Sequence, residues 1–296
     1  MNKSFTLIEI LVVIVVIGIL SAFILVGMSS IASSANIAKV QAFINSMDNA
    51  LLLGRVSQWK FDELTTAKEA QPIRDSWGSN NGTLYTGSDG LEKISSNCPS
   101  GNCLSFDGAD DYVSVSDADS LDITNTITVS VWVKTLGSGT GVTPGIIAKR
   151  NNGFGLIWMD QAETNIYARI YQSDDTQINT DSFLVSQNIW HNIVLVANTG
   201  DNKVRIYLDT TEKGTSKSYN GTVKTGDSSL SIGQQSLSYF NGLIDDVRIY
   251  NQAIPTSEIQ QNYFVGLNNL YKNKGITLNE FNQRIVELKT NLVKNE

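Results

Sequence analysis

The chain opens with a long apolar stretch. Between Ile10 and Val26 every residue is apolar apart from one glycine and one serine, and the stretch extends back to Phe5. A helix needs about 20 apolar residues to cross a bilayer, so this pattern predicts a membrane-spanning helix. Lys3 precedes the stretch and no charged residue follows it until Lys39, which predicts that the N-terminus faces the cytoplasm.

One charged residue, Glu9, stands inside this stretch. A carboxylate within a membrane helix costs at least ~2.5 kcal/mol and therefore marks a functional residue. The alternative interpretation of the N-terminus is a cleavable secretory signal peptide. Against it, the apolar run is too long for the core of such a peptide, and no small-x-small cleavage site follows in a polar context.

Helical spacing continues beyond the apolar stretch. Ile31, Ala35, Ala38, Ala42 and Met47 recur near a helical period with polar residues between them, and no proline occurs before residue 72. We therefore expect one helix over about 5–53, ending near residue 54. Its second half is amphipathic, which predicts packing against a globular domain.

From residue 55 onward the pattern changes to period-two alternation. In TVSVWVK, Val129, Val131 and Val133 share one face, and the residues between them share the other. Further strands are expected at NIYARIY, HNIVLVA, KVRIYLD and GLIDDVRIY, with polar turns between them. Short strands without intervening helices predict an antiparallel β-sandwich, or jelly roll.

After residue 254 the pattern returns to helix. Ser257 with Gln260, and Thr277 with Glu280, have the spacing of capping boxes, and the last helix is expected over about 278–292. The chain as a whole is thus predicted to be an α+β protein. A long N-terminal helix is followed by the antiparallel sandwich and by short C-terminal helices.

Charge and rare residues exclude several functions. The formal net charge is -7 and Lys and Arg do not cluster, which argues against nucleic-acid binding. A single histidine, His191, excludes catalytic or metal sites that need two. Cys98 and Cys103 are the two cysteines, and a small disulfide in an exported domain is favoured over a partial metal site.

The string SFTLIE, from Ser4 to Glu9, resembles the processing signal of type IV prepilins and type II secretion pseudopilins. The resemblance implies cleavage by a prepilin peptidase between Ser4 and Phe5, followed by N-methylation of Phe5. It also implies that Glu9 pairs with the terminal amine of a neighbouring subunit. The physics agrees, because a buried carboxylate is tolerable once it meets a cation.

The β-rich part resembles the concanavalin A-like, laminin G-like superfamily of bacterial extracellular proteins. The motifs are LSFDGADDYVSV, TVSVWVK, IWHNIVLV, VRIYLD and FNGLIDDVRIYNQAI, with WKFDE and DSWGSNNGTL as the opening strand and loop. The predicted organisation is a leader at 1–4, a pilin helix at 5–54 with 5–27 in the membrane or filament core, a sandwich at 55–254, and a helical segment at 255–296. The resemblance defines a fold, and its members serve as glycan-binding modules, adhesion domains, hydrolases and spacers.

The sequence predicts that the protein is not an enzyme. The acidic string of the superfamily's hydrolases is missing, and glycoside hydrolysis needs two facing carboxylates. The adjacent acidic pairs at 110–111, 174–175 and 245–246 would point to opposite faces of a strand. His191 is expected to be a structural imidazole bonded to a neighbouring strand.

The superfamily resemblance implies a structural Ca²⁺ held by loop carboxylates. Asp245 is the predicted ligand, with Asp75 and Asp107 as its partners. The alternative is that Asp75 and Asp107 are turn residues bonded to their own backbone.

Four aromatic residues are available for stacking on sugars: Trp158, Tyr167, Tyr171 and Tyr239. Aromatic residues at alternating strand positions usually pack within the sheet, so packing is the favoured interpretation of each and the ligand-binding residues stay undefined.

The favoured interpretation is a pilus subunit, with a minor subunit as one option, whose sandwich faces outward and serves adhesion. A pseudopilin of a secretion or DNA-uptake machine is the alternative, and a membrane-tethered glycan hydrolase is disfavoured. The expected partners are other pilin subunits, the prepilin peptidase, the membrane, and surface glycans or proteins. The expected location is the bacterial cytoplasmic membrane before assembly and an extracellular filament afterwards.

Overall fold

The structure is a computed structural model of the 296-residue chain. It describes residues 54–294 with the exception of 67, 88–93, 138, 150–155 and 160–164. The predicted membrane-spanning helix, with the processing and assembly residues Ser4, Phe5 and Glu9, lies outside the described residues. Among the described residues, no helix is both long and apolar enough to cross a membrane. Residues 54–296 form one compact unit, which we call the head.

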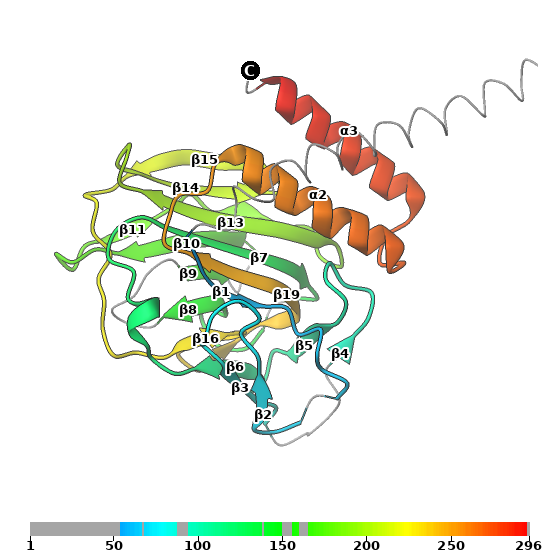
Figure 1. The fold of residues 1–296 in the computed structure, drawn as a ribbon, viewed down its shortest axis with the longest axis horizontal. Coiled ribbons are helices and arrows are strands. Elements are labelled where there is room, and N and C mark those ends of the chain that lie inside the picture. Colours follow the sequence, from blue (N-terminus) through cyan, green and yellow to red (C-terminus); the bar gives the residue numbers. More distant parts are fainter. Residues whose placement is uncertain are drawn as a thin grey trace, which may run out of the picture. The chain divides into compact units, whose positions relative to one another are not determined.

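Two antiparallel sheets make up most of the head (Figure 1). The first sheet has the strand order β15-β14-β13-β7-β19-β5-β4, and β1 also pairs with β19. Its strands are β1 (Arg55–Trp59), β4 (Ile94–Ser95), β5 (Cys103–Asp107), β7 (Ile127–Thr135), β13 (Trp190–Asn198), β14 (Lys203–Leu208), β15 (Thr211–Ser218) and β19 (Asn241–Tyr250).

The second sheet has the strand order β11-β10-β9-β8-β16-β6-β3-β2, and β12 also pairs with β10. Its strands are β2 (Gln71–Ile73), β3 (Gly82–Tyr85), β6 (Tyr112–Val115), β8 (Gly145–Lys149), β9 (Leu156–Met159), β10 (Asn165–Tyr171), β11 (Gln177–Asn179), β12 (Phe183–Leu184) and β16 (Leu230–Ile232). A short hairpin, β17 (Gln234–Gln235) and β18 (Ser238–Tyr239), and one 3-10 turn, η1 (Asp119–Leu121), complete the sandwich.

The core lies between the two sheets. In β7, Val129, Val131 and Val133 are fully buried in it, as the alternation predicted, and Val113 and Val115 of β6 enter it from the second sheet. Successive side chains of a strand point to opposite faces, so each sheet contributes every second residue. The predicted β-sandwich is therefore confirmed.

Two helices, α2 (Thr256–Lys272) and α3 (Leu278–Lys294), cover the outer face of the first sheet (Figure 1). Trp132 points away from the core of the sandwich, yet it is only 1% exposed. Its ring stacks on Tyr263 of α2, with centroids 5.5 Å apart and planes 5° from parallel. A Cβ added to Gly266 would lie 2.4 Å from the Trp132 ring, so only glycine allows this close approach.

The beginnings of the two helices differ from each other. The helix α2 follows Pro255, whose carbonyl oxygen accepts the N–H groups of Glu258 and Ile259, and it has no side-chain cap. The predicted capping box at Ser257 is wrong, because that residue already lies in the first helical turn. At α3, the Thr277 hydroxyl accepts the N–H of residue 280 at 3.2 Å, as predicted.

Candidate functional site

The outer face of the second sheet differs from that of the first because its side chains are partly exposed. Tyr85, Tyr112, Ser114 and Ser231 point outward here, and their neighbours along each strand are buried in the core. Strand pairing places Tyr85 opposite Tyr112, and Ser114 opposite Ser231. We call this surface the open face. Tyrosine and serine side chains bind ligands by contact and hydrogen bonding.

A cleft with a volume of about 220 Å³ lies on the open face. Tyr112, Ser114, Ser231 and Ala148 form its floor, and they come from the adjacent strands β6, β16 and β8. Ser229 precedes β16 and also lines the cleft. The floor is therefore set by strand register rather than by a loop.

The β17–β18 hairpin supplies the wall of the cleft through Gln234, Gln235 and Ser236. The amide nitrogen of Gln235 donates to the Ser236 hydroxyl at 2.7 Å, and its amide oxygen accepts the Thr143 hydroxyl at 3.2 Å. A Cβ added to Gly145 would lie 2.6 Å from Gln235, so the hairpin crosses directly over the start of β8. These contacts hold the wall in place before a ligand arrives.

Three tyrosines form a row along the cleft. Tyr85 stacks on Tyr112 with centroids 4.7 Å apart, and Tyr239 lies 6.3 Å from Tyr112 at a tilt. Burial, followed by the neighbouring phenols of Tyr85 and Tyr239 and then by the charge of Glu69, raises the pKa of Tyr112. The phenol therefore stays protonated at neutral pH and can donate a hydrogen bond.

Of the four aromatic residues singled out in the sequence, Tyr239 lies next to Tyr112, which lines the cleft. Tyr167 and Tyr171 pack on Ala148 and flank the guanidinium of Arg169 at 5.6 and 5.9 Å. These two tyrosines line the open face on β10, beside the cleft. The side chain of Trp158 is not among the described parts of the structure.

An acidic group lies in the turn between β5 and β6. The carboxylate oxygens of Asp107, Asp110 and Asp111 lie within 4.8 Å of one another, an arrangement that could hold a metal ion. Asp107 was predicted as a ligand, and the other two were not. The sequence argument that the pair at 110–111 points to opposite faces is wrong, because both residues precede β6 and lie in a turn.

The structure does not bring Asp75, Asp107 and Asp245 together into one group among the described residues. Asp75 accepts the backbone N–H groups of residues 58, 77, 78 and 80, at 2.9 to 3.0 Å. Asp107 accepts the N–H of Ala109 at 2.8 Å. Both residues therefore stabilise turns, as the alternative to calcium required. Their role as metal ligands, and that of Asp245, remains a prediction.

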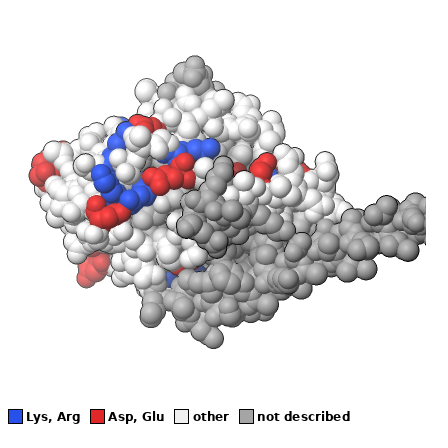
Figure 2. All heavy atoms as spheres, turned by 90° about the horizontal axis from the view of Figure 1, so that it is seen from above, with Lys and Arg blue, Asp and Glu red and all other residues white. Residues whose placement is uncertain are grey.

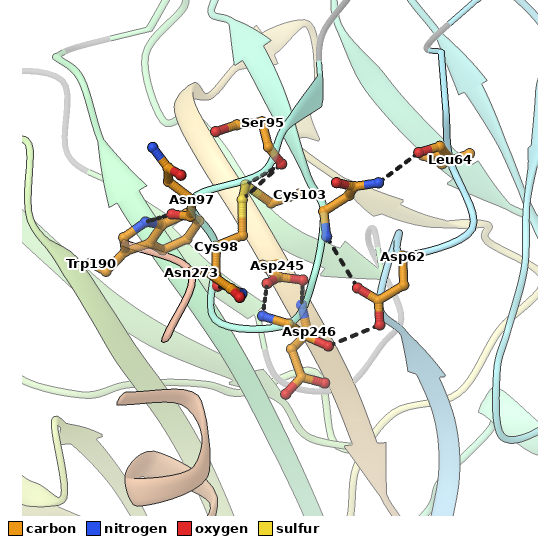
Figure 3. The surroundings of a disulfide bond; sticks show 12 residues. Asp62, Leu64, Ser95, Asn97, Cys98, Cys103, Trp190, Asp245, Asp246 and Asn273 are labelled. Atoms are coloured by element: carbon orange, nitrogen blue, oxygen red, sulfur yellow. Dashed lines mark hydrogen bonds between the residues drawn. A yellow bond between two sulfur atoms is a disulfide. The ribbon is translucent and has the colours of Figure 1, made fainter. Parts of the chain in front are cut away.

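Asp245 is fully buried on β19 beneath the loop that the predicted disulfide closes (Figure 3). Cys98 and Cys103 are bonded to each other. One oxygen of Asp245 accepts the N–H of Ser100 in this loop at 2.7 Å, and the other accepts the N–H of Asp246 at 2.6 Å. Burial, followed by the charges of Asp246 and Asp62, raises the pKa of Asp245 well above its usual value.

The disulfide loop also joins the sandwich to the helices. Asn273, at the end of α2, donates to the carbonyl oxygen of Cys98 at 3.0 Å, and the Trp190 indole donates to that of Asn97 at 3.1 Å (Figure 3). Asp62 accepts the hydroxyl of Ser100 at 3.0 Å. The loop thus connects the segment after β1, strands β13 and β19, and the end of α2.

His191 was predicted to bond to a neighbouring strand, and its imidazole bonds to the turn that follows the neighbouring strand β14. Its Nδ1 lies 2.6 Å from a carboxylate oxygen of Asp209, in the turn between β14 and β15. A larger hollow of about 370 Å³ lies nearby, between these strands and α3. Two of its charged groups already have protein partners: Arg284 donates to the carbonyl of Trp190, and Asp209 also accepts the N–H of Asn192. We therefore regard the open face as the better candidate site.

Charge gives no alternative site on the surface seen from above. Basic and acidic side chains lie next to one another there (Figure 2). Ion pairs between described residues include Arg205 with Asp201, at 2.5 Å, and Lys217 with Asp181. Such mixed surfaces carry no strong single-sign field.

The head is an antiparallel β-sandwich whose first sheet is covered by helices and whose second sheet has a partly exposed outer face. The chain belongs to the concanavalin A-like lectin/glucanases superfamily, whose model matches residues 107–260, just over half of the chain. Residues 1–25 match the prokaryotic N-terminal methylation motif. Both resemblances seen in the sequence are confirmed. No curated protein matches the chain significantly.

Similar solved structures share the fold of the head. Domain 4 of AbnA, a GH43 extracellular arabinanase from Geobacillus stearothermophilus in complex with arabinotriose, is 21% identical with a TM-score of 0.52, over 72% of this chain and 98% of that one. The binding domain of Paraclostridial Mosquitocidal Protein 1 is 15% identical with a TM-score of 0.57, over 73% and 53%. The binding domain of botulinum neurotoxin serotype D is 15% identical with a TM-score of 0.55, over 74% and 52%. The chain thus spans about half the length of the two toxin domains.

Sequence reasoning missed the cleft. Its floor residues are short polar side chains at alternating strand positions, as in YVSV and LSI, and this pattern is also typical of any solvated strand. The hairpin wall, at GQQSLSY, carries a turn signal but no chemical motif. Only the pairing of β6, β8 and β16 brings these residues together.

Proposed function

We propose that the protein is a type IV pilin-like subunit that displays a lectin-like adhesion domain outside the cell. The observation that carries this proposal is the fusion itself. A methylation motif at residues 1–25 precedes a head of the concanavalin A-like lectin/glucanases superfamily. A disulfide in the head is consistent with export to an oxidising compartment.

Assembly would follow from the processing signal. A prepilin peptidase would cut between Ser4 and Phe5 and leave Glu9 near the new terminus, within the membrane. The carboxylate of Glu9 would then pair with the terminal amine of a neighbouring subunit, because an ionised group in a membrane helix needs a partner. The chain would reside in the cytoplasmic membrane before assembly and in an extracellular filament afterwards.

The role of the head is binding rather than catalysis in this proposal. Its open face presents tyrosines, serines and a preformed cleft, which suit the contact of a surface glycan. A pseudopilin with a purely structural head is the alternative. The partly exposed tyrosine row favours the adhesive role, because a spacer needs no such surface.

We also place a structural Ca²⁺ at the group formed by Asp107, Asp110 and Asp111. Carboxylate and backbone oxygens are the ligands that Ca²⁺ prefers, and these carboxylates already converge. A hundredfold excess of Ca²⁺ over its Kd would stabilise the head by about 2.7 kcal/mol. This corresponds to a rise in melting temperature of roughly 5–10 °C. Asp110→Asn should reduce the rise, and equal melting with Ca²⁺ and with a chelator would exclude the site.

Two measurements test the proposed function. Mass spectrometry of the mature protein should show an N-terminus at Phe5, methylated or plain, and any other N-terminus contradicts the pilin assignment. Antibodies against the head should label filaments, and cells that produce the chain without its head should adhere less than the wild type. A head found only in the cell envelope, with unchanged adherence, would favour the pseudopilin alternative.

A further inference from the structure

We propose that the cleft on the open face binds a terminal, uncharged sugar residue of a surface glycan. This inference rests on the proposed adhesive function and names the site and the class of its ligand. The described residues that line the cleft all carry neutral side chains: one tyrosine, four serines, two glutamines and one alanine.

The chemistry of the lining suits hydroxyl groups. Serine and tyrosine hydroxyls both donate and accept hydrogen bonds, and each glutamine offers two donors and an acceptor. A sugar presents hydroxyls that also do both, whereas a carboxylate accepts only. Ser114 and Ser231 are register partners on the floor, so their hydroxyls lie side by side, with Gln235 on the wall beside them.

The size of the cleft favours one sugar residue rather than a chain. Its volume of about 220 Å³ lies below the roughly 300–1,000 Å³ of pockets that enclose drug-sized ligands. The cleft opens at the surface and does not run along the whole sheet. It therefore suits the end of a glycan that projects from another surface.

Preorganisation and an aromatic surface support binding. The hairpin wall is held over β8 by Gln235, and the backbone N–H of Tyr239 donates to the carbonyl oxygen of Thr140 at 3.1 Å. A wall that is already ordered loses little entropy when a ligand binds. Tyr112 lies on the floor between Tyr85 and Tyr239 and offers an apolar edge to the C–H groups of a sugar.

An acidic group next to the cleft floor acts against acidic sugars, whereas the guanidinium of Arg169 on β10 is already in contact with Tyr167 and Tyr171. Asp111, the last member of the acidic group formed with Asp107 and Asp110, directly precedes Tyr112 of the cleft floor. Even with one Ca²⁺ bound, three carboxylates leave a net negative charge. An anionic sugar would meet this field, and discrimination by repulsion is a common source of specificity.

The test measures binding of the purified full-length protein, kept in detergent, to immobilised oligosaccharides. The panel contains neutral glycans, each paired with the same glycan carrying a terminal sialic acid. Unit charges about 10 Å apart predict a roughly 2- to 15-fold preference for the neutral member of each pair. Added salt should shrink this preference, because it screens the repulsion.

Variants locate the site. Ser114→Ala combined with Ser231→Ala, and Gln235→Ala separately, should weaken binding about two- to tenfold for each lost hydrogen bond. Ser182→Ala and Gln187→Ala carry the same changes at exposed positions before β13, outside the cleft, and should bind like the wild type. Circular dichroism and melting curves confirm that each variant is folded.

A gain of function gives an independent check. Ser229 lines the cleft and is exposed, so Ser229→Arg introduces a cation without disturbing the core. This variant should raise the affinity for the sialylated glycans relative to their neutral partners. An unchanged ratio would show that the discriminating field is not at the cleft.

Three outcomes overturn the inference. Equal or tighter binding of sialylated glycans contradicts the neutral ligand, and binding that survives all cleft variants contradicts the location. If the full-length protein binds no glycan of the panel, the ligand class is wrong. In each case the adhesive function is still supported if wild-type cells adhere and cells that produce the chain without its head do not. Failure of the cleft inference can therefore be distinguished from failure of the proposed adhesive function.

Discussion

The buried carboxylate of Asp245 makes the stability of the head depend on pH in a specific direction. Burial, then the charges of Asp246 and Asp62, raise the pKa of Asp245 well above its usual value, so the folded state holds a proton that the unfolded state releases. The contribution of protonated Asp245 to the free energy of unfolding is fully present below the pKa of Asp in the unfolded chain, about 3.9. It is lost as the pH rises through the folded pKa.

The size of the effect follows from proton linkage. While the native state binds one proton more than the unfolded state, the free energy of unfolding falls by about 1.4 kcal/mol per pH unit. Asp246 affects the stability of the head in a different pH range. Its burial tends to raise its pKa, but the ion pair with Arg248 at 2.6 Å prevails and lowers it. The stability from Asp246 is therefore present above pH 3.9 and is lost below it.

The assay is urea unfolding of residues 54–296, followed by tryptophan fluorescence between pH 4 and pH 8. Stability should fall from pH 4 upward in the wild type, and Asp245→Asn should remove most of this slope. At pH 4 the variant should be about 1–3 kcal/mol less stable, because its amide N–H group faces a backbone donor. Asp227→Asn is the matched control, since Asp227 is exposed and solvent screens its charge.

The same experiment decides the sequence-based calcium prediction for Asp245. A calcium ligand must be ionised, so metal binding at Asp245 would make stability rise with pH, and only when Ca²⁺ is present. The claim that buried Asp245 is protonated in the folded state is refuted by two results together. The first is that the stability of the wild type rises between pH 4 and pH 8 when Ca²⁺ is present, and the second is that this rise disappears in Asp245→Asn.

Three further predictions follow from single features of the chain. Glu9→Ala should leave membrane insertion intact but block incorporation into filaments, so normal filaments in electron micrographs of this variant would contradict the assembly role. Cys98→Ser together with Cys103→Ser should destabilise the head by less than the ~3 kcal/mol of a 15-residue loop, and free thiols in the native, unreduced protein would exclude the bond. Gly266→Ala should destabilise the head by about 1–3 kcal/mol, because the added methyl group overpacks against Trp132, even though alanine has the better helix propensity. Asn268→Ala on the same helix is the control for helix propensity. Equal melting temperatures for the two variants would contradict the close approach.

The sequence determined what local patterns encode. Period-two alternation placed β7, β13 and β19 correctly. The spacing of Cys98 and Cys103 predicted their disulfide, and Thr277 predicted the start of α3. The short string around Glu9 predicted the family of the N-terminus. Each of these signals lies within about ten residues of chain.

Tertiary structure alone decided which surfaces are covered. Alternation assigns side chains to two faces of a strand, but it does not say which face a distant helix will cover. Trp132 and Tyr112 both point away from the core, yet α2 buries the first and leaves the second at an open cleft. The burial of Asp245 beneath the disulfide loop likewise depends on contacts between segments far apart in the chain. Such contacts are set by packing of the whole head, for which the local sequence carries no separate signal.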